Sequence, residues 1–282
     1  MLNDFIVRYQ ILKIVFSFCF MAAASMFWLA SAPPAYSQKP TKKDIAVFSP
    51  KKAKLKAMQA RGFIKTGLRP VYPADFDCPK GVSGFASQTR FDGSRRSFKY
   101  FRGLHGGYDI PADEGTPIVA MADGTVVHKS RGKGIGGIGI ILQHAPDDTG
   151  LGAWIYTEYK HLMKMPSLEL GQRVKKGQQV GLNGKTGTTG GYYGLSGFAH
   201  LHLTTWYSER ADYTVGKLFI PVGGQWMDPL ALFRSDNLLD SHVLRRLDKN
   251  AKRVLITYIS SDGRLHPENS RIVWPFICNP KS

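Results

Sequence analysis

The chain has 282 residues, of which 43% are hydrophobic and 12% aromatic, and it carries a formal net charge of +17. This composition excludes a disordered chain and suits one sizeable domain with attachments or two small domains. The charge implies an anionic partner, either nucleic acid, anionic lipid or an acidic envelope polymer, but does not choose among them.

The first 37 residues have the features of a secretory signal peptide. Two basic residues precede an apolar run at 14–30, and Ala35 and Ser37 occupy the −3 and −1 positions for cleavage before Gln38. The alternative is an uncleaved membrane anchor, for which the run is short. Export to the periplasm or cell envelope argues against nucleic acid as a partner and favours an anionic envelope polymer.

Residues 38–77 form a basic N-terminal segment. Its lysine-rich part, residues 38–66, offers only a thin apolar stripe of Leu55, Met58 and Phe63. We therefore expect a solvated basic helix or a linker that binds the anionic envelope. A segment that folds back over the active groove is the alternative.

Residues 78–234 predict an all-β domain, because short β-branched runs alternate with glycine-rich turns. We expect a two-sheet antiparallel β-sandwich or barrel-like core. The pair Asp123–Gly124, between "IVAMA" and "TVV", predicts a β-hairpin. A phosphate-binding loop is disfavoured because no strand–loop–helix pattern surrounds the later glycines, so they predict tight turns. These glycines are Gly171, Gly177, Gly181, Gly184 and Gly187.

Residues 235–282 are expected to form a small C-terminal α+β appendage. Residues 235–250 predict a helix capped by Ser235, and residues 253–278 predict two or three strands around the turn at Asp262–Gly263.

Once the signal peptide is removed, only Cys78 and Cys278 remain. Two cysteines in an exported protein predict one disulfide, with two unpaired thiols as the alternative. Neither cysteine lies near a metal-like cluster of residues.

Two short histidine motifs carry the chemistry. In "GFAHLHLTTW", at residues 197–206, His200 and His202 lie two apart and share one face of a strand. Taken alone, this is consistent with a surface strand that carries incidental histidines. In "HGGYDIP", Asp109 follows His105 by four residues, which in an extended chain also puts both on one face. Taken alone, that pair is consistent with a hydrogen-bonded turn.

Together the two motifs offer two imidazole nitrogens and one carboxylate oxygen. Three protein ligands with a fourth position open to water are typical of a catalytic zinc site, whereas a structural site would be closed, usually by cysteines. The motif "YKHL", which contains His161, lies between them.

The order of "HGGYDIPADEGTPIVAMADGTVV", "TEYKHL", "GQRVKKGQQVGLNGKTGTTG" and "HLHL" closely resembles the lysostaphin-like (LytM-type) zinc metallopeptidases, which are peptidoglycan endopeptidases. The resemblance covers residues 79–210. It implies a two-sheet antiparallel fold of the duplicated hybrid motif type with a groove across it. It also implies that His105, Asp109 and His202 bind one Zn²⁺ per chain.

The resemblance further implies that His161 and His200 are catalytic histidines that do not bind the metal. An imidazole can serve as base, acid or oxyanion stabiliser near neutral pH, and the sequence does not divide these roles between the two. A tyrosine upstream of the first ligand, here Tyr100, is implied as a further catalytic residue. The remaining histidines are interpreted as structural or exposed: His128, His144, His242 and His266.

The chain also departs from the family pattern. Residues 81–105 lack a clean copy of the usual serine–x–phenylalanine–glycine–x–arginine motif, and the turns before "YKHL" and "HLH" are longer than usual. We expect Tyr192, Tyr193 and Trp206 to line the substrate groove.

The sequence therefore predicts an exported, monomeric zinc metalloendopeptidase that hydrolyses peptide cross-links of peptidoglycan. Alternatives are a non-catalytic wall-binding module or activator of another wall hydrolase, which would lack metal ligands, and an exported protease that acts on proteins. A carrier domain of the barrel-sandwich type would need a modified lysine or one phosphorylated histidine instead of a three-ligand set.

Overall fold

A computed structural model describes residues 39–131, 136–188 and 197–281. The contact pattern divides the chain into Met1–Ala32 and Pro33–Ser282, and the described residues all belong to the second unit. The predicted signal peptide and the predicted groove residues Tyr192 and Tyr193 lie outside the described residues. Among the helices of the described ranges, none is long and apolar enough to cross a membrane.

The basic N-terminal segment begins with two short helices, α2 (Lys42–Phe48) and α3 (Leu55–Ala60). A capping box between Thr41 and Asp44 starts α2. Phe48, Met58 and Phe63 are 4%, 0% and 0% exposed, so the prediction of a solvated basic helix or linker is wrong.

The prediction failed because the apolar residues of this segment are divided among α2, α3 and the turn after α3, which together form one buried apolar face. The sequence of either helix alone does not show this face. Phe48 and Phe63 both stack on Trp226, with ring centroids 5.6 and 4.5 Å away. All the lysines of this segment are exposed: Lys39, Lys42, Lys43, Lys51, Lys52, Lys54, Lys56 and Lys65.

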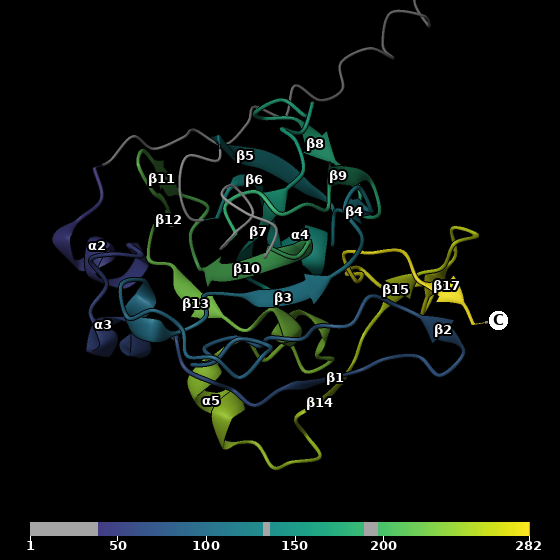
Figure 1. The fold of residues 1–282 in the computed structure, drawn as a ribbon, viewed down its shortest axis with the longest axis horizontal. Helices are drawn as coiled ribbons and strands as arrows, with labels where there is room; N and C mark the ends of the chain where they lie inside the picture. The colour runs from purple at the N-terminus through teal and green to yellow at the C-terminus, as the bar shows by residue number, and fades with distance from the viewer. Residues whose placement is uncertain (1–38, 132–135, 189–196, 282) are drawn as a thin grey trace, which may run out of the picture. The chain divides into compact units, whose positions relative to one another are not determined.

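The next part of the unit is built mainly of β-strands (Figure 1). The first elements are β1 (Arg69–Val71), β2 (Phe76–Asp77), the 3-10 helix η1 (Phe101–Gly103), β3 (Tyr108–Pro111), β4 (Pro117–Val119), β5 (Gly124–Arg131) and β6 (Ile138–His144). They are followed by α4 (Pro146–Thr149), β7 (Trp154–Leu162), β8 (Arg173–Val174), β9 (Gln179–Leu182), β10 (His200–Ser208), β11 (Tyr213–Val215), β12 (Phe219–Pro221), β13 (Gln225–Met227) and the 3-10 helix η2 (Pro229–Phe233).

A seven-stranded antiparallel sheet forms the centre of this unit. Its order is β13-β10-β7-β6-β5-β8, with β3 also paired to β10. Smaller two-stranded sheets accompany it, among them the antiparallel pair β4-β9. The prediction of an all-β antiparallel fold is confirmed.

The hairpin predicted at Asp123–Gly124 is wrong, because β4 pairs with β9 and not with β5. Gly124 is needed for a different reason. A Cβ there would lie 2.7 Å from Nδ1 of His144 and 2.9 Å from the carbonyl oxygen of Gln143, so only glycine lets β5 approach β6 this closely.

The predicted glycine turns are partly confirmed. Gly171, Gly177 and Gly187 have φ values of 84°, 79° and 68°, the left-handed region that favours glycine. Gly181 and Gly184 serve close packing instead, since a Cβ would lie 2.9 Å from the Leu162 side chain and 2.5 Å from the Met163 nitrogen respectively.

Successive residues of the central strands point to opposite faces of the sheet, and each face carries its own core. In β10, Leu201 and Leu203 belong to one core, while Trp206 belongs to the other together with Phe48 of the N-terminal segment. By the same alternation, the face of Trp206 is also the face of His200 and His202.

The C-terminal residues add α5 (Ser241–Arg246), β14 (Arg253–Leu255), β15 (Tyr258–Ile259), β16 (Leu265–His266) and β17 (Asn279–Pro280). The predicted helix at 235–250 is wrong in extent, because the Asp240 side chain accepts a hydrogen bond from His242 N and starts the helix there. The turn at Gly263, with φ 83°, does join β15 to β16. Residues 271–278 form no regular strand.

These C-terminal residues are not a separate appendage, because they pack into the core that contains Leu201 and Leu203. Trp274 and Phe276 are 1% and 0% exposed and share that core with Leu201 of β10. Cys78 and Cys278 are joined by a disulfide bond.

Candidate metal centre

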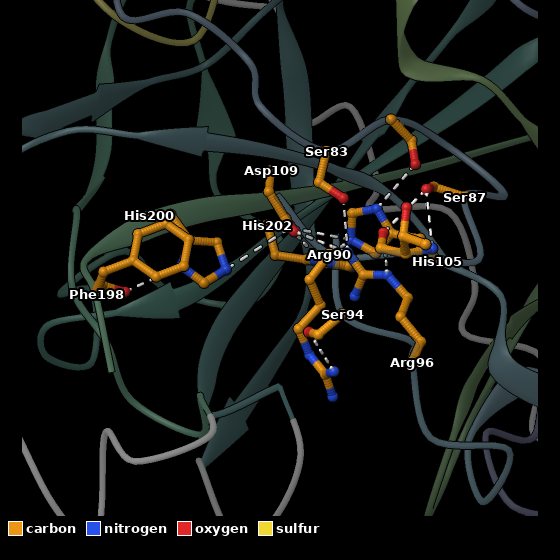
Figure 2. Close-up of polar contacts among 12 residues, drawn as sticks. Ser83, Ser87, Arg90, Ser94, Arg96, His105, Asp109, Phe198, His200 and His202 are labelled. Carbon is orange, nitrogen blue, oxygen red and sulfur yellow. Dashed lines mark hydrogen bonds and ion pairs between the residues drawn. The ribbon is translucent and has the colours of Figure 1, made fainter. Parts of the chain in front are cut away.

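Three side chains converge near the start of β10: His105, Asp109 and His202 (Figure 2). Asp109 Oδ1 lies 3.0 Å from His105 Nε2 and 2.9 Å from His202 Nδ1. The two imidazole nitrogens are 3.1 Å apart. One carboxylate oxygen and two ring nitrogens therefore face a common centre.

Strand pairing produces this convergence. Asp109 in β3 lies directly opposite His202 in β10, and directly opposed residues have neighbouring Cβ atoms. His105 precedes β3, and its carbonyl and amide bond to Ala86 N and Ser87 O. A Cβ at Gly107 would lie 2.4 Å from the Leu203 carbonyl oxygen and 2.8 Å from His202 Nε2, so glycine is required there.

The hydrogen bond of His105 fixes which nitrogen faces the site. Its Nδ1 lies 3.0 Å from the carbonyl oxygen of Gly84, which can only accept, so Nδ1 carries the proton and donates. A neutral His105 then presents the Nε2 lone pair to the carboxylate oxygen 3.0 Å away. Two lone pairs at this distance repel each other unless a cation or a proton lies between them.

This donor set fits a zinc ion. Zinc bonds of 2.0–2.1 Å in tetrahedral geometry separate ligand atoms by about 3.3 Å. This value is close to the 2.9–3.1 Å between the donor atoms of His105, Asp109 and His202. Two imidazole nitrogens and one carboxylate oxygen are ligand types that zinc accepts. A histidine that binds metal commonly donates a hydrogen bond from its other ring nitrogen to a backbone carbonyl, as His105 does to Gly84.

Burial and neighbouring groups set the charges of the ligands. Burial alone would raise the pKa of Asp109, but its neighbours His105 and His202 hold it well below its usual value. Burial lowers the pKa of His202 to about 3. An ionised carboxylate and a neutral imidazole are the states in which these residues bind metal.

His161 of β7 and His200 of β10 flank the three donors. Their ring centroids are 4.7 Å apart, and His200 Nε2 lies 3.6 Å from Asp109 Oδ1. His161 Nδ1 donates to the Thr186 carbonyl oxygen at 2.7 Å, and His200 Nδ1 donates to the Phe198 carbonyl oxygen at 3.0 Å. In both neutral rings the free lone pair is therefore on Nε2.

Both flanking histidines are held as neutral bases. Burial is the main reason that the pKa of each histidine is lowered. The pKa of His161 lies well below the usual value for histidine. His161 also has a φ of 63°, a left-handed conformation that is rare outside glycine and that concentrates at functional sites.

The predicted groove residue Trp206 does not line a surface. It is 5% exposed, and Phe48 of α2 packs edge-on against it with ring centroids 6.5 Å apart. The prediction is wrong because the N-terminal segment covers this end of the β10 face.

The other predicted residues lie as follows. Tyr100 precedes η1 and lies beside Lys99, and within the described ranges no hydrogen bond joins it to the three donors. His144 is buried and bonds the Asp123 carbonyl oxygen and Thr157 Oγ1 at 2.6 and 2.8 Å, as a structural histidine does. His128 and His266 are half-buried, and His242 is exposed on α5.

Several contacts at the site could not be read from the sequence. Arg96 Nη2 lies 3.3 Å from Asp109 Oδ2 and 2.7 Å from Ser83 Oγ (Figure 2). Arg96 is one of two adjacent arginines in a strongly basic chain, so its residue type gave no signal. The contacts of Gly84, Thr186 and Phe198 use backbone carbonyls, which every residue has.

Comparison with known proteins gives the following matches. Residues 103–213 match the sequence profile described as peptidase family M23. An uncharacterized metalloprotease of Haemophilus influenzae is 36% identical over 107 residues, which is 38% of this chain and 19% of the relative. The peptidoglycan DD-endopeptidase ShyA of Vibrio cholerae is 35% identical over 98 residues, 35% of this chain and 19% of the relative. The chain thus spans about a fifth of the length of these relatives.

Among solved structures, the catalytic domain of lysostaphin from Staphylococcus simulans is similar, with 28% identity and a TM-score of 0.31. That alignment covers 39% of this chain and 71% of the lysostaphin domain.

Proposed function

Because residues 103–213 match the profile of peptidase family M23, we propose that this chain is an exported zinc metalloendopeptidase that hydrolyses peptide cross-links of peptidoglycan. The observation that carries the proposal is the three-donor group of His105, Asp109 and His202. Its donor atoms lie within 4.8 Å of one another. Three protein ligands, with water or substrate in the fourth position, are the ligand number of a catalytic zinc site.

Zinc, when bound by these residues, supplies the Lewis acidity that peptide-bond hydrolysis requires. The chain's own residues then handle protons. His200 and His161 each present an unprotonated Nε2 beside the metal ligands, because a backbone carbonyl holds the proton on Nδ1. Either ring can accept a proton at Nε2 from the attacking water and later deliver one to the leaving amine.

The choice of substrate rests on the relatives. One is named a peptidoglycan DD-endopeptidase, and another, from Neisseria meningitidis, a DD-carboxypeptidase/endopeptidase. Export is supported by the signal-like first 37 residues and by the disulfide between Cys78 and Cys278, a bond that persists in oxidising compartments. The exposed lysines of residues 39–65 suit an anionic envelope polymer, and they belong to a folded surface rather than a tether.

The proposal is tested by incubating the purified protein with muropeptides and identifying the products by mass spectrometry, with casein assayed in parallel. Chelation should abolish cross-link cleavage, and one equivalent of zinc should restore it. Undiminished cleavage by metal-free protein would contradict the metal mechanism. Cleavage of casein without cleavage of muropeptides would identify a protease that acts on proteins, and zinc binding without any cleavage would identify a non-catalytic module.

A further inference from the structure

Residues 88–96 form a small hairpin, which the segment containing η1 connects to the first metal ligand, His105. Thr89 bridges to Arg95, Arg90 N donates to Ser94 O at 2.9 Å, and Arg96 N donates to Gln88 O at 3.0 Å. The stem continues into the site, because His105 N donates to Ser87 O. This hairpin occupies the region in which the sequence departs from the family motif.

At its base, the hairpin reaches a metal ligand. The Arg96 guanidinium spans three partners: Nε donates to Thr89 O at 3.2 Å, while Nη2 lies 2.7 Å from Ser83 Oγ and 3.3 Å from Asp109 Oδ2. The side chains of Arg96 and Asp109 are 19% and 9% exposed. The charged donor thus holds the outer oxygen of the carboxylate, and the inner oxygen, Oδ1, faces the two imidazoles (Figure 2).

At its tip, the hairpin reaches a flanking histidine. Phe91 packs edge-on against Phe198, with ring centroids 4.6 Å apart. Phe198 in turn stacks on His200, with centroids 4.4 Å apart and an interplanar angle of 21°. Phe198 therefore fixes His200 twice, through its ring and through the carbonyl oxygen that accepts from His200 Nδ1 at 3.0 Å.

We propose that the hairpin of residues 88–96 is a positioning element for the metal centre, in which Arg96 orients Asp109 and Phe91 orients His200 through Phe198. The inference rests on the proposed function, since it concerns the same ligands. Within the described residues, no hydrogen bond or ion pair joins Arg96 or Phe91 to His105 or His202. Arg96 holds one carboxylate oxygen of Asp109, so that only the other oxygen faces the metal. Phe91 restricts rotation of the His200 ring through Phe198.

The Arg96 arm is tested by zinc affinity, measured by chelator competition, and by the visible absorption of the Co²⁺-loaded protein. Arg96→Met should weaken zinc affinity about 10- to 100-fold, as loss of a group that supports a ligand usually does, and should shift the Co²⁺ spectrum. Arg96→Lys keeps one charged donor and should recover part of the affinity. Arg95→Met is the matched control, because Arg95 is exposed on the same hairpin and its loss changes the net charge equally.

Equal affinities in Arg96→Met and Arg95→Met would overturn the Arg96 arm. Tighter zinc binding in Arg96→Met would also overturn it, because Arg96 would then act only by repelling the cation. A melting curve for each variant establishes that it is folded. If the unsubstituted protein fails to bind zinc, the proposed function fails, and that result is separate from a failure of the hairpin inference.

The Phe91 arm is tested by steady-state kinetics. Phe91→Ala should lower kcat roughly two- to tenfold, the range expected from losing one aromatic pair, with KM and zinc affinity unchanged. Phe98→Ala is the control, since Phe98 is 71% exposed on the segment that follows the hairpin. A raised KM with unchanged kcat would show that Phe91 contacts substrate instead. Equal kinetics in both variants would show that the tip has no role.

Discussion

The metal ligands and the flanking histidines are held in different ways. Asp109 and His202 are cross-strand neighbours in the β3–β10 ladder, so sheet pairing itself brings them together. His161 and His200 are oriented instead by the loop carbonyls of Thr186 and Phe198. The metal contacts of Asp109 and His202 should therefore depend on the pairing of β3 with β10, and proton transfer on loop geometry, so that the two can be damaged separately.

The largest expected effect is the loss of a ligand. His105→Ala removes one of three donors, so both bound zinc and peptidase activity should disappear together. Elemental analysis of the purified variant, with the muropeptide assay, measures both. Full activity in metal-free His105→Ala protein would refute the assignment.

Loss of a flanking histidine should separate the two functions. His161→Ala should keep its zinc and lose roughly 100- to 10,000-fold in kcat, the usual contribution of a general acid or base. Zinc content and kcat are measured on the same preparation. If zinc is lost as well, His161 belongs to the ligand set and the distinction between the regions fails.

A smaller effect is expected from the loop that supports His161. A Cβ at Gly137, where φ is 61°, would lie 2.0 Å from the Thr186 carbonyl oxygen that accepts from His161. Gly137→Ala should displace this carbonyl and lower kcat about tenfold or more, because small misplacements of catalytic groups are costly. Zinc content should not change.

The matched control for this variant is Gly152→Ala. Gly152 has a φ of 69°, but a Cβ at this position would meet nothing within 4 Å, so the control shares the backbone strain of about 1–2 kcal/mol without the crowding. Similar kcat values for the two variants would show that the Thr186 carbonyl does not control His161.

The smallest effect on the site is expected from the disulfide. Replacing both Cys78 and Cys278 with serine should lower the free energy of unfolding by about 2–5 kcal/mol and leave zinc affinity unchanged, because the bond braces the opposite face of the sheet. Urea unfolding and chelator competition provide the two values. A tenfold loss of zinc affinity would contradict this separation.

These differences also explain what the sequence could predict. Residue type and the two-residue period of a strand pair His105 with Asp109 and put His200 and His202 on one face, whereas the choice of His202 as the third ligand came from the family resemblance. The structure brings His105, Asp109 and His202 together. Their support comes from backbone carbonyls and from Arg96, one arginine among many, and these carry no distinctive local signal. Long-range pairing was likewise hidden, since Gly124 follows a typical hairpin aspartate and yet permits close packing on β6.

Two of the wrong predictions, the solvated N-terminal segment and the placement of Trp206 in the groove, share one cause. Trp206 lies on the same strand face as His202, so alternation alone put it beside the site. It is covered because α2 places Phe48 against it, and the lysine-rich sequence of that segment concealed its apolar side.

The most direct test of the central claim is the zinc content of two variants, each of which lacks one histidine of β10. His202→Ala should contain no zinc, whereas His200→Ala should retain one zinc per chain and lose turnover. Each variant requires a melting curve to establish that it is folded. Equal zinc loss in both, or full zinc in both, would contradict the assignment of His202 to the metal and His200 to the proton.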